Sequence, residues 1–155
     1  MLDERPTTTL VIRITTQDDI STITYLDSFS TSPTRDLHRD MQKYFGSIDP
    51  STHERTLIFL GEINETAAAK AELMLPTTPL SPPIGYIKRV IVHPNFRGQG
   101  LAKQLMQHIV QAAHGEYHLE AVDLLVWEEN RAAIRLYEDL GFQLRHRELY
   151  YRLTL

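Results

Sequence analysis

The sequence predicts a mixed α/β fold, of the α+β kind, in a single domain over residues 1–155. Its second half alternates strand-like and helix-like segments, which is typical of a mixed sheet with helices packed on it. Its first half contains two strand-like segments joined by a short polar turn, as in a hairpin. The chain has 155 residues, 42% hydrophobic and 23% charged, which suits one domain with a buried core.

The first half predicts a strand and then two helices. Residues 10–14 are rich in β-branched side chains and predict the first strand. Thr16 and Asp19 have the spacing of a capping box, and apolar residues at helical spacing extend a helix to about Phe29. A second helix is expected over residues 36–44, where apolar side chains recur at steps of three and four.

The hairpin follows these helices. Residues 56–60 and 67–75 predict its two strands, with the turn at 62–65. The alanine-rich start of the second strand favours a helix by propensity, so its assignment as a strand depends on context. The proline-rich segment 76–83 is expected to be a loop.

The second half predicts three strand-like segments separated by two helices, the helices ending at Gly115 and Gly141. In chain order these elements cover residues 84–92, 101–115, 121–127, 130–140 and 142–155.

Composition excludes several kinds of chemistry and partner. The chain has no cysteine, so disulfides, thiolate metal sites and a cysteine nucleophile are excluded. A net charge of −4 argues against a nucleic-acid-binding protein with a broad basic surface. The polar N-terminus and short apolar runs indicate neither a secretory signal nor a membrane span. We therefore expect a cytoplasmic protein with no nucleic-acid or membrane partner.

The segment between residues 92 and 101 has the composition of an anion-binding turn. A strand leads through Gly98 and Gly100 directly into a helix, whose first backbone N–H groups have no partner within the helix. Glycines let a phosphate approach those N–H groups, and Arg97 adds a positive charge. The spacing fits neither a Walker loop nor a dinucleotide fingerprint, because Lys103 stands where the latter needs its third glycine. A tight turn with glycines for geometry alone is the alternative.

Two blocks of the chain, in the right order and spacing, match a known pair of motifs. Arg97-Gly98-Gln99-Gly100-Leu101-Ala102 matches the signature Arg/Gln-x-x-Gly-x-Gly/Ala, and residues 130–142 match Asn-x-x-Ala-x-x-x-Tyr-x-x-x-Gly-Phe. Over residues 84–142 the chain therefore resembles the GNAT superfamily of N-acetyltransferases. The resemblance implies a twisted, mostly antiparallel sheet of six or seven strands with about four helices. In such a sheet the fourth and fifth strands are parallel and splayed.

The resemblance also implies acetyl-CoA as the cosubstrate and indicates which residues hold it. Backbone groups of Val90, Ile91 and Val92 would pair with the pantetheine arm, and an amide near Val92 would act as the oxyanion donor. Asn130 matches a position that contacts the cofactor arm, and it equally suits a helix N-cap. The pyrophosphate would lie on the turn formed by Arg97, Gly98, Gln99, Gly100, Leu101, Ala102 and Lys103.

The reaction implied is direct transfer of an acetyl group to an amine within a ternary complex. Tyr137 matches the family's general acid toward the CoA thiolate, and its alternative role is that of an aromatic core residue. The lack of cysteine agrees with transfer that needs no enzyme nucleophile. The acceptor would be the amine of a small molecule, peptide or protein, and the enzyme a monomer or homodimer. A non-catalytic acyl-CoA-binding domain is the alternative function.

The sequence does not identify a general base. The family often places a glutamate on the fourth strand, where this chain has Lys88 and Arg89, expected to point to opposite faces and into solvent. Contact of one of them with a CoA phosphate or with the substrate is the alternative. Glu72, Glu128 and Glu129 are the nearest carboxylates by topology, and each is expected to be a surface charge. We expect no metal site, because the spacing of His114 and His118 spans a helix end.

Overall fold

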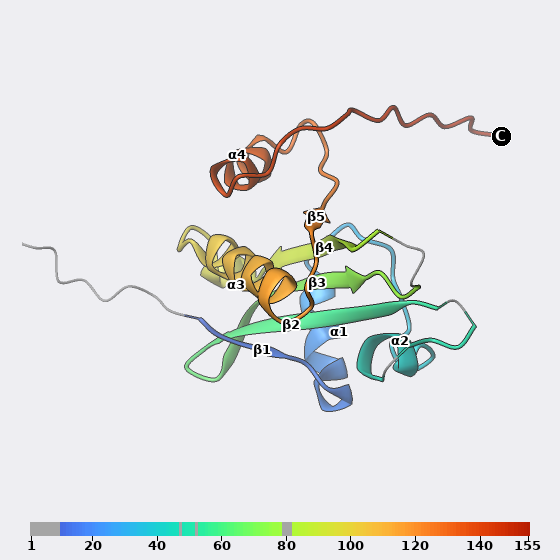
Figure 1. Ribbon diagram of the computed structural model, residues 1–155. Helices are drawn as coiled ribbons and strands as arrows, with labels where there is room; N and C mark the ends of the chain where they lie inside the picture. The colour runs from blue at the N-terminus through green and yellow to red at the C-terminus, as the bar shows by residue number, and fades with distance from the viewer. Residues whose placement is uncertain (1–9, 47, 52, 79–81) are drawn as a thin grey trace, which may run out of the picture. The chain divides into compact units, whose positions relative to one another are not determined.

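The computed structural model describes residues 10–46, 48–51, 53–78 and 82–155. They form two compact units, Met1–Leu125 and Val126–Leu155 (Figure 1). The N-terminus and part of the proline-rich segment lie outside the described residues. Among the described residues, no helix combines the length and apolar character needed to cross a bilayer.

The first unit is built on a five-stranded sheet in which the strands lie in chain order. The first four strands pair antiparallel, and the fifth pairs parallel to the fourth, which confirms the mixed sheet and the parallel fourth and fifth strands. The strands are β1 (Val11–Ile14), β2 (Arg55–Ile63), β3 (Thr66–Leu75), β4 (Ile84–Val92) and β5 (Ala121–Asp123). The expected count of six or seven strands is therefore too high.

The β2–β3 hairpin forms as predicted, and its turn explains where it bends. Asn64 and Glu65 both have positive φ, 49° and 65°, as in the two-residue turns whose twist matches a hairpin. Ala68, Ala69 and Ala71 are fully buried in the middle of the sheet. Tertiary packing therefore overrides the helix propensity of this alanine-rich segment.

The helices of the first unit begin where the capping signals predict, but one is shorter than expected. The Thr16–Asp19 capping box is present at a 3-10 turn (Gln17–Asp19) that leads into α1 (Ile20–Asp27). Helix α2 covers only Met41–Phe45, which corrects the prediction of a helix from residue 36. The Asp36 carboxylate accepts a hydrogen bond from the His38 N–H at 3.0 Å, so this segment begins with a turn instead of a helix.

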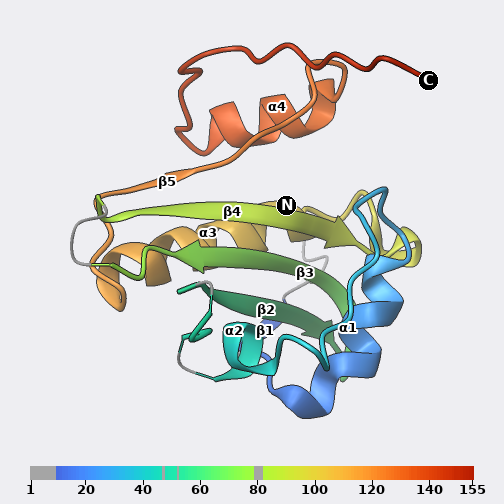
Figure 2. The ribbon, with the colours of Figure 1, turned by 90° about the vertical axis from the view of Figure 1, so that its right-hand side faces the viewer.

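Helices cover both faces of the sheet, as Figure 2 shows. Helix α3 (Leu101–Gly115) lies on one face, where Phe59 of β2 contacts His108. Helices α1 and α2 cover the other face, over Ile58 of β2. Because alternate strand residues point to opposite faces, Lys70 and Glu72 of β3 lie on the α1 and α2 face.

The second unit contains α4 (Arg131–Asp139) and no strand among its residues. Asn130 caps α4 by accepting a hydrogen bond from the Ala133 N–H at 3.2 Å. Gly141, at φ 99°, follows the helix end as predicted. The strand-like segment expected over 142–155 is not a strand, and this accounts for the strand count. A strand needs a neighbour to complete its hydrogen bonds, and this unit contains none.

Candidate active site

The turn that joins β4 to α3 has the backbone conformation of an anion cradle. Gly98 and Gly100 have φ of 79° and 75°, in the left-handed region that favours glycine, and Gly100 is the N-cap of α3. No heavy atom of another residue lies within 4 Å of the place where a Cβ of either glycine would be. The space that a phosphate needs next to the first N–H groups of α3 is therefore available.

Most of the predicted residues of this turn, Arg97–Lys103, are exposed, and one buried residue anchors the turn to the core. Leu101 is buried, 2% exposed, and fixes the start of α3 against the core. Ala102 is half-buried, while Gln99 and Lys103 are exposed. The Arg97 side chain is exposed, and its Nε donates to the Val92 carbonyl at 3.3 Å. We call residues 97–103 the glycine turn.

The C-terminal half of β4 presents backbone groups along one edge. The pairing of β5 with β4 involves only Ile84, Gly85 and Tyr86, because β5 ends at Asp123. Val90, Ile91 and Val92 therefore have no partner in β5.

The direction of the Val92 backbone follows from its neighbour. The His93 N–H donates to the Ala68 carbonyl of β3 at 2.8 Å. Backbone groups of successive strand residues point to opposite edges, so those of Val92 point away from β3. The Arg97–Val92 hydrogen bond is made on that side. The Val92 N–H thus points toward the edge of β4 that is opposite β3.

Asn130 and Tyr137 belong to the second unit, whereas the glycine turn and β4 belong to the first. Asn130 has the capping role that the sequence offered as one of two interpretations. Tyr137 is half-buried, with its ring centroid 5.9 Å from that of Phe142. Burial raises the pKa of the Tyr137 hydroxyl, so this group keeps its proton at neutral pH.

The sequence analysis missed a buried group of ion pairs on the α1 and α2 face of the sheet. Glu72 is fully buried, and the Arg35 guanidinium binds both of its carboxylate oxygens, one of them from Nη1 at 2.7 Å. Lys70 is also fully buried, and its Nζ lies 2.6 Å from Glu72 Oε2 and 2.8 Å from Asp27 Oδ1. Arg35 also binds Asp27, at 3.1 Å. We call Asp27, Arg35, Lys70, Glu72 and Arg89 the ionic cluster.

Glu72 is therefore neither a surface charge nor a suitable base. Burial alone would raise its pKa, but hydrogen bonds from Arg35 and the charges of Lys70 and Arg35 outweigh burial. The pKa of Glu72 lies below its ordinary value, which makes the carboxylate a weaker base. A buried, paired carboxylate of this kind positions its neighbours and does not take up protons.

A β-bulge brings Arg89 into the same cluster. Between the pairs Lys70–Ile91 and Glu72–Lys88, β4 has two residues opposite the single Ala71 of β3. Arg89 occupies this bulge with φ 51°, and its side chain is 14% exposed. It donates to the Pro33 carbonyl at 2.9 Å and lies 3.8 Å from Asp27. The prediction that Lys88 and Arg89 point to opposite faces and into solvent is wrong, because strict alternation fails at a bulge.

His93, directly after β4, is held by both ring nitrogens. Its Nδ1 accepts from the Asn95 N–H at 3.0 Å, so in the neutral ring Nε2 carries the proton. Nε2 lies 3.1 Å from the Tyr25 hydroxyl. With Nδ1 already accepting and Nε2 already protonated, His93 is unsuited to take a proton from an acceptor amine.

Glu128 and Glu129 belong to the second unit and are exposed there, as the sequence analysis expected, and Glu128 forms a 3.4 Å ion pair with Arg147. Among the described residues, no group of three or more histidine, aspartate or glutamate side chains is arranged to hold a metal ion.

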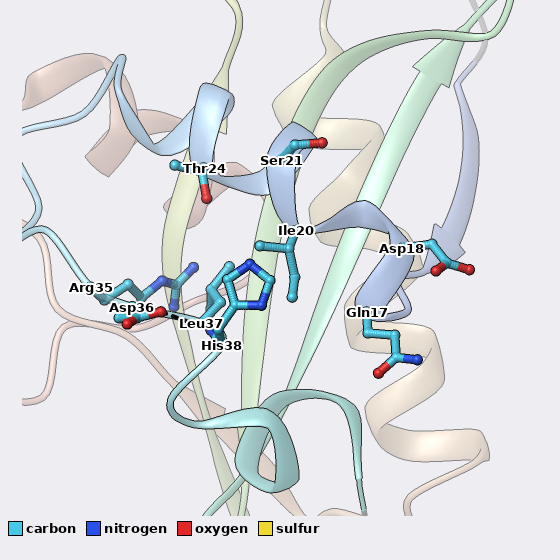
Figure 3. A pocket seen from close by; sticks show the side chains of 9 residues that line it. All are labelled: Gln17, Asp18, Ile20, Ser21, Thr24, Arg35, Asp36, Leu37 and His38. Carbon is cyan, nitrogen blue, oxygen red and sulfur yellow. Dashed lines mark hydrogen bonds between the residues drawn. The ribbon is translucent and has the colours of Figure 1, made fainter.

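A groove of about 640 Å³ lies between the start of α1 and the segment before α2 (Figure 3). Arg35 lines this groove and also binds Glu72, so it connects the groove to the ionic cluster. The groove otherwise has both polar and apolar walls, formed by Gln17, Asp18, Ile20, Ser21, Thr24, Asp36, Leu37 and His38.

Two curated proteins are similar to a part of this chain. The chain is 31% identical over 58 residues to the spermine/spermidine N(1)-acetyltransferase of Bacillus subtilis, a match to 37% of this chain and 38% of the relative. It is 38% identical over 58 residues to N-alpha-acetyltransferase 30 of Saccharomyces cerevisiae, covering 37% of this chain and 32% of the relative. These matches therefore span about a third of each curated relative.

The fold matches over nearly the whole chain. A solved structure of AAC(6')-Iy in complex with the bisubstrate analogue CoA-S-monomethyl-acetylneamine superposes with a TM-score of 0.72 at 21% identity. The superposition covers 95% of this chain and 99% of that one. The model of the acetyltransferase (GNAT) family matches residues 18–142, which include both sequence blocks, the β4 edge and the glycine turn. The chain belongs to the acetyltransferase (GNAT) family.

Proposed function

We propose that this protein is an N-acetyltransferase that moves the acetyl group of acetyl-CoA directly to an amine. The observation that carries the proposal is the glycine turn at the open edge of β4, with two left-handed glycines and space where their side chains would be. The family match and the fold shared with a CoA-analogue complex support it.

In this proposal the glycine turn binds the pyrophosphate of the cosubstrate. The first N–H groups of α3 donate to its oxygens, and the helix dipole favours the negative charge. Arg97 and Lys103 are exposed on the same turn and would contribute positive charge. Val90, Ile91 and Val92 would pair with the pantetheine arm through backbone groups, as a further strand would.

The chemical step would use two groups of this chain. The Val92 N–H would donate to the thioester oxygen as negative charge develops there, which lowers the barrier to attack by a neutral amine. Tyr137 would donate its proton to the leaving thiolate and so complete the transfer. In the transfer a carbon–nitrogen bond forms, the carbon–sulfur bond breaks, and the amine proton is lost to solvent, from which Tyr137 regains the proton that it gave to the thiolate.

The proposal is tested by measuring thiol release from acetyl-CoA with a panel of amines. We expect turnover with at least one amine and none when the amine is omitted. Tight CoA binding without turnover for any amine would indicate a non-catalytic acyl-CoA sensor instead. No change in melting temperature with CoA would contradict both functions, because a ligand that binds the folded state raises its stability.

A further inference from the structure

Lys88 is a cation on the α1 and α2 face that lies outside the ionic cluster. It lies directly across from Glu72 in the β3–β4 pairing, so both side chains lie on the same face. Both Glu72 oxygens are already bound by Arg35 and Lys70. Within the part of the chain that the structure describes, Lys88 has no hydrogen bond or ion pair, and it is only half-buried.

The ionic cluster and Lys88 together carry more positive than negative charge. Arg35, Lys70, Arg89 and Lys88 carry four positive charges, against two negative charges on Asp27 and Glu72. The neighbouring Lys43 is neutralised by Glu54, 2.7 Å away. This group of residues therefore has a surplus of two positive charges, and burial lowers the pKa of Lys88 within it. Partly buried cations of this kind are favourable binding partners for an anion.

Lys88 lies on the same strand as Val92, so the surplus positive charge lies near the place of the proposed reaction. Lys88 lies four residues before Val92, a separation of about 13 Å along an extended strand. The bulge at Arg89 lies between them and shortens the path. A small molecule or the terminus of a peptide with its amine near Val92 would bring a group several bonds further along within reach of the Lys88 ammonium.

We propose that Lys88, backed by the ionic cluster, selects an acceptor amine that also carries a carboxylate or phosphate group and binds that anionic group. The inference rests on the proposed acetyl transfer and names the acceptor's chemical class. An acceptor made only of amines, such as a polyamine, would meet like charge on this face and bind poorly.

The test uses matched acceptor pairs that differ only in the anionic group. The pairs are 4-aminobutyrate and 4-aminobutyramide, phosphoethanolamine and ethanolamine, and two dipeptide amides with glutamate or glutamine as the second residue. We expect kcat/KM to favour the anionic member of at least one pair by roughly 10- to 100-fold, the range of one charge-assisted hydrogen bond. The pair with the largest preference identifies whether the anion is a carboxylate or a phosphate. Spermidine should be a poor acceptor.

Two variants test whether Lys88 causes the preference for the anionic acceptor. Lys88→Met should lower it to about threefold or less, mainly by raising KM for the anionic acceptor. Lys43→Met removes a nearby cation that Glu54 already neutralises, so it should leave the preference unchanged. Lys88→Met should melt no lower than the wild type, because it removes a charge without breaking a pair. A wild type that prefers neutral amines or spermidine, or a Lys88→Met variant that keeps the preference, would overturn the inference.

A binding measurement separates this inference from the proposed function. Calorimetry on the CoA-bound protein would compare the same acceptor pairs in a complex that cannot react. Anionic acceptors that bind, and bind more weakly to Lys88→Met, without turnover would contradict acetyl transfer and support the anion site. Turnover with neutral amines and no binding preference for anionic ones would do the reverse. No binding of any acceptor to the CoA-bound protein would contradict both.

Discussion

Gly98 and Gly100 contribute to the glycine turn by having no side chain. Their left-handed conformation costs an L-residue roughly 1–2 kcal/mol, and a methyl group at either would also enter the space proposed for phosphate. The backbone cost and the steric block are separate effects. The two effects can be measured separately by making the same substitution at a glycine outside the turn that has the same conformation.

We predict that Gly100→Ala weakens CoA binding at least tenfold, whereas Gly141→Ala does not. Both glycines have positive φ, 75° and 99°, and neither has a heavy atom of another residue within 4 Å of its added Cβ. Both variants should therefore lose roughly 1–2 kcal/mol of stability through backbone strain. Calorimetric titration with CoA and thermal unfolding measure the two effects. Equal CoA affinity in both variants would contradict the phosphate cradle.

At Tyr137, burial raises the pKa of the hydroxyl and so preserves the proton that the leaving thiolate needs. We predict that Tyr137→Phe lowers kcat roughly 100-fold, at the low end of general acid catalysis, with little change in CoA affinity. The measurement is thiol release at saturating acetyl-CoA. Tyr151→Phe, a matched change in the same unit, should keep the wild-type kcat. A Tyr137→Phe variant with wild-type kcat would assign Tyr137 a packing role only.

Strand β3 carries the ionic cluster, and its stability should depend on pH through Glu72. A carboxyl group whose folded-state pKa is lowered stabilises the fold at neutral pH. That contribution is lost as the pH falls below the ordinary glutamate value of about 4.3 and through the folded-state pKa. The direction holds because Arg35 and Lys70 favour the charged form.

We predict that Glu72→Gln lowers the free energy of unfolding at pH 7 by about 3–5 kcal/mol, since it leaves buried cations without a partner. The difference from the wild type should shrink on acidification, because protonation removes the same charge from the wild type. Denaturant unfolding at pH 7 and at a series of pH values from about 4 down to about 2.5 measures it. Glu65→Gln, at the hairpin turn where the side chain is exposed, is the control and should change stability little. A difference that stays constant with pH would contradict the account.

The bulge in β4 should reverse the ordinary preference for alanine over glycine in a strand. Arg89 has φ 51°, where alanine is strained and glycine is not. We predict that Arg89→Gly is at least as stable as Arg89→Ala, although both lose the contact with Asp27. At Met74, an ordinary strand position, alanine should be the more stable of the two. Urea unfolding of the four variants tests the comparison, and the same order at both positions would argue against the bulge.

Across the whole molecule, features that depend on neighbouring residues in the sequence were predicted well. Features that depend on partners far away in the sequence were predicted poorly. The Thr16 capping box, the two glycines and the hairpin turn each act within a few residues, so the sequence alone is enough to locate them. The strand expected after Phe142 failed because a strand depends on a neighbour that a local pattern does not specify.

The ionic cluster on the α1 and α2 face was not predicted, because its members lie far apart in the sequence. Arg35 and Glu72 are 37 residues apart, and Asp27 and Lys70 are 43 residues apart, so no local pattern relates them. One signal was available, because Lys70 and Glu72 alternate with alanines in a segment expected to lie inside the sheet. Charges at alternate positions of a central strand indicate buried pairs. The bulge at Arg89 had no such signal, since a single extra residue leaves the composition of a strand unchanged.

The central claim is that the acetyl group passes directly from acetyl-CoA to an amine while both are bound. The measurement that tests it is the initial rate of thiol release as both substrates are varied together. Direct transfer predicts double-reciprocal lines that intersect, because both substrates must be present before the thiol leaves. Parallel lines, with a burst of thiol before the amine is added, would reveal an acyl-enzyme and contradict the account.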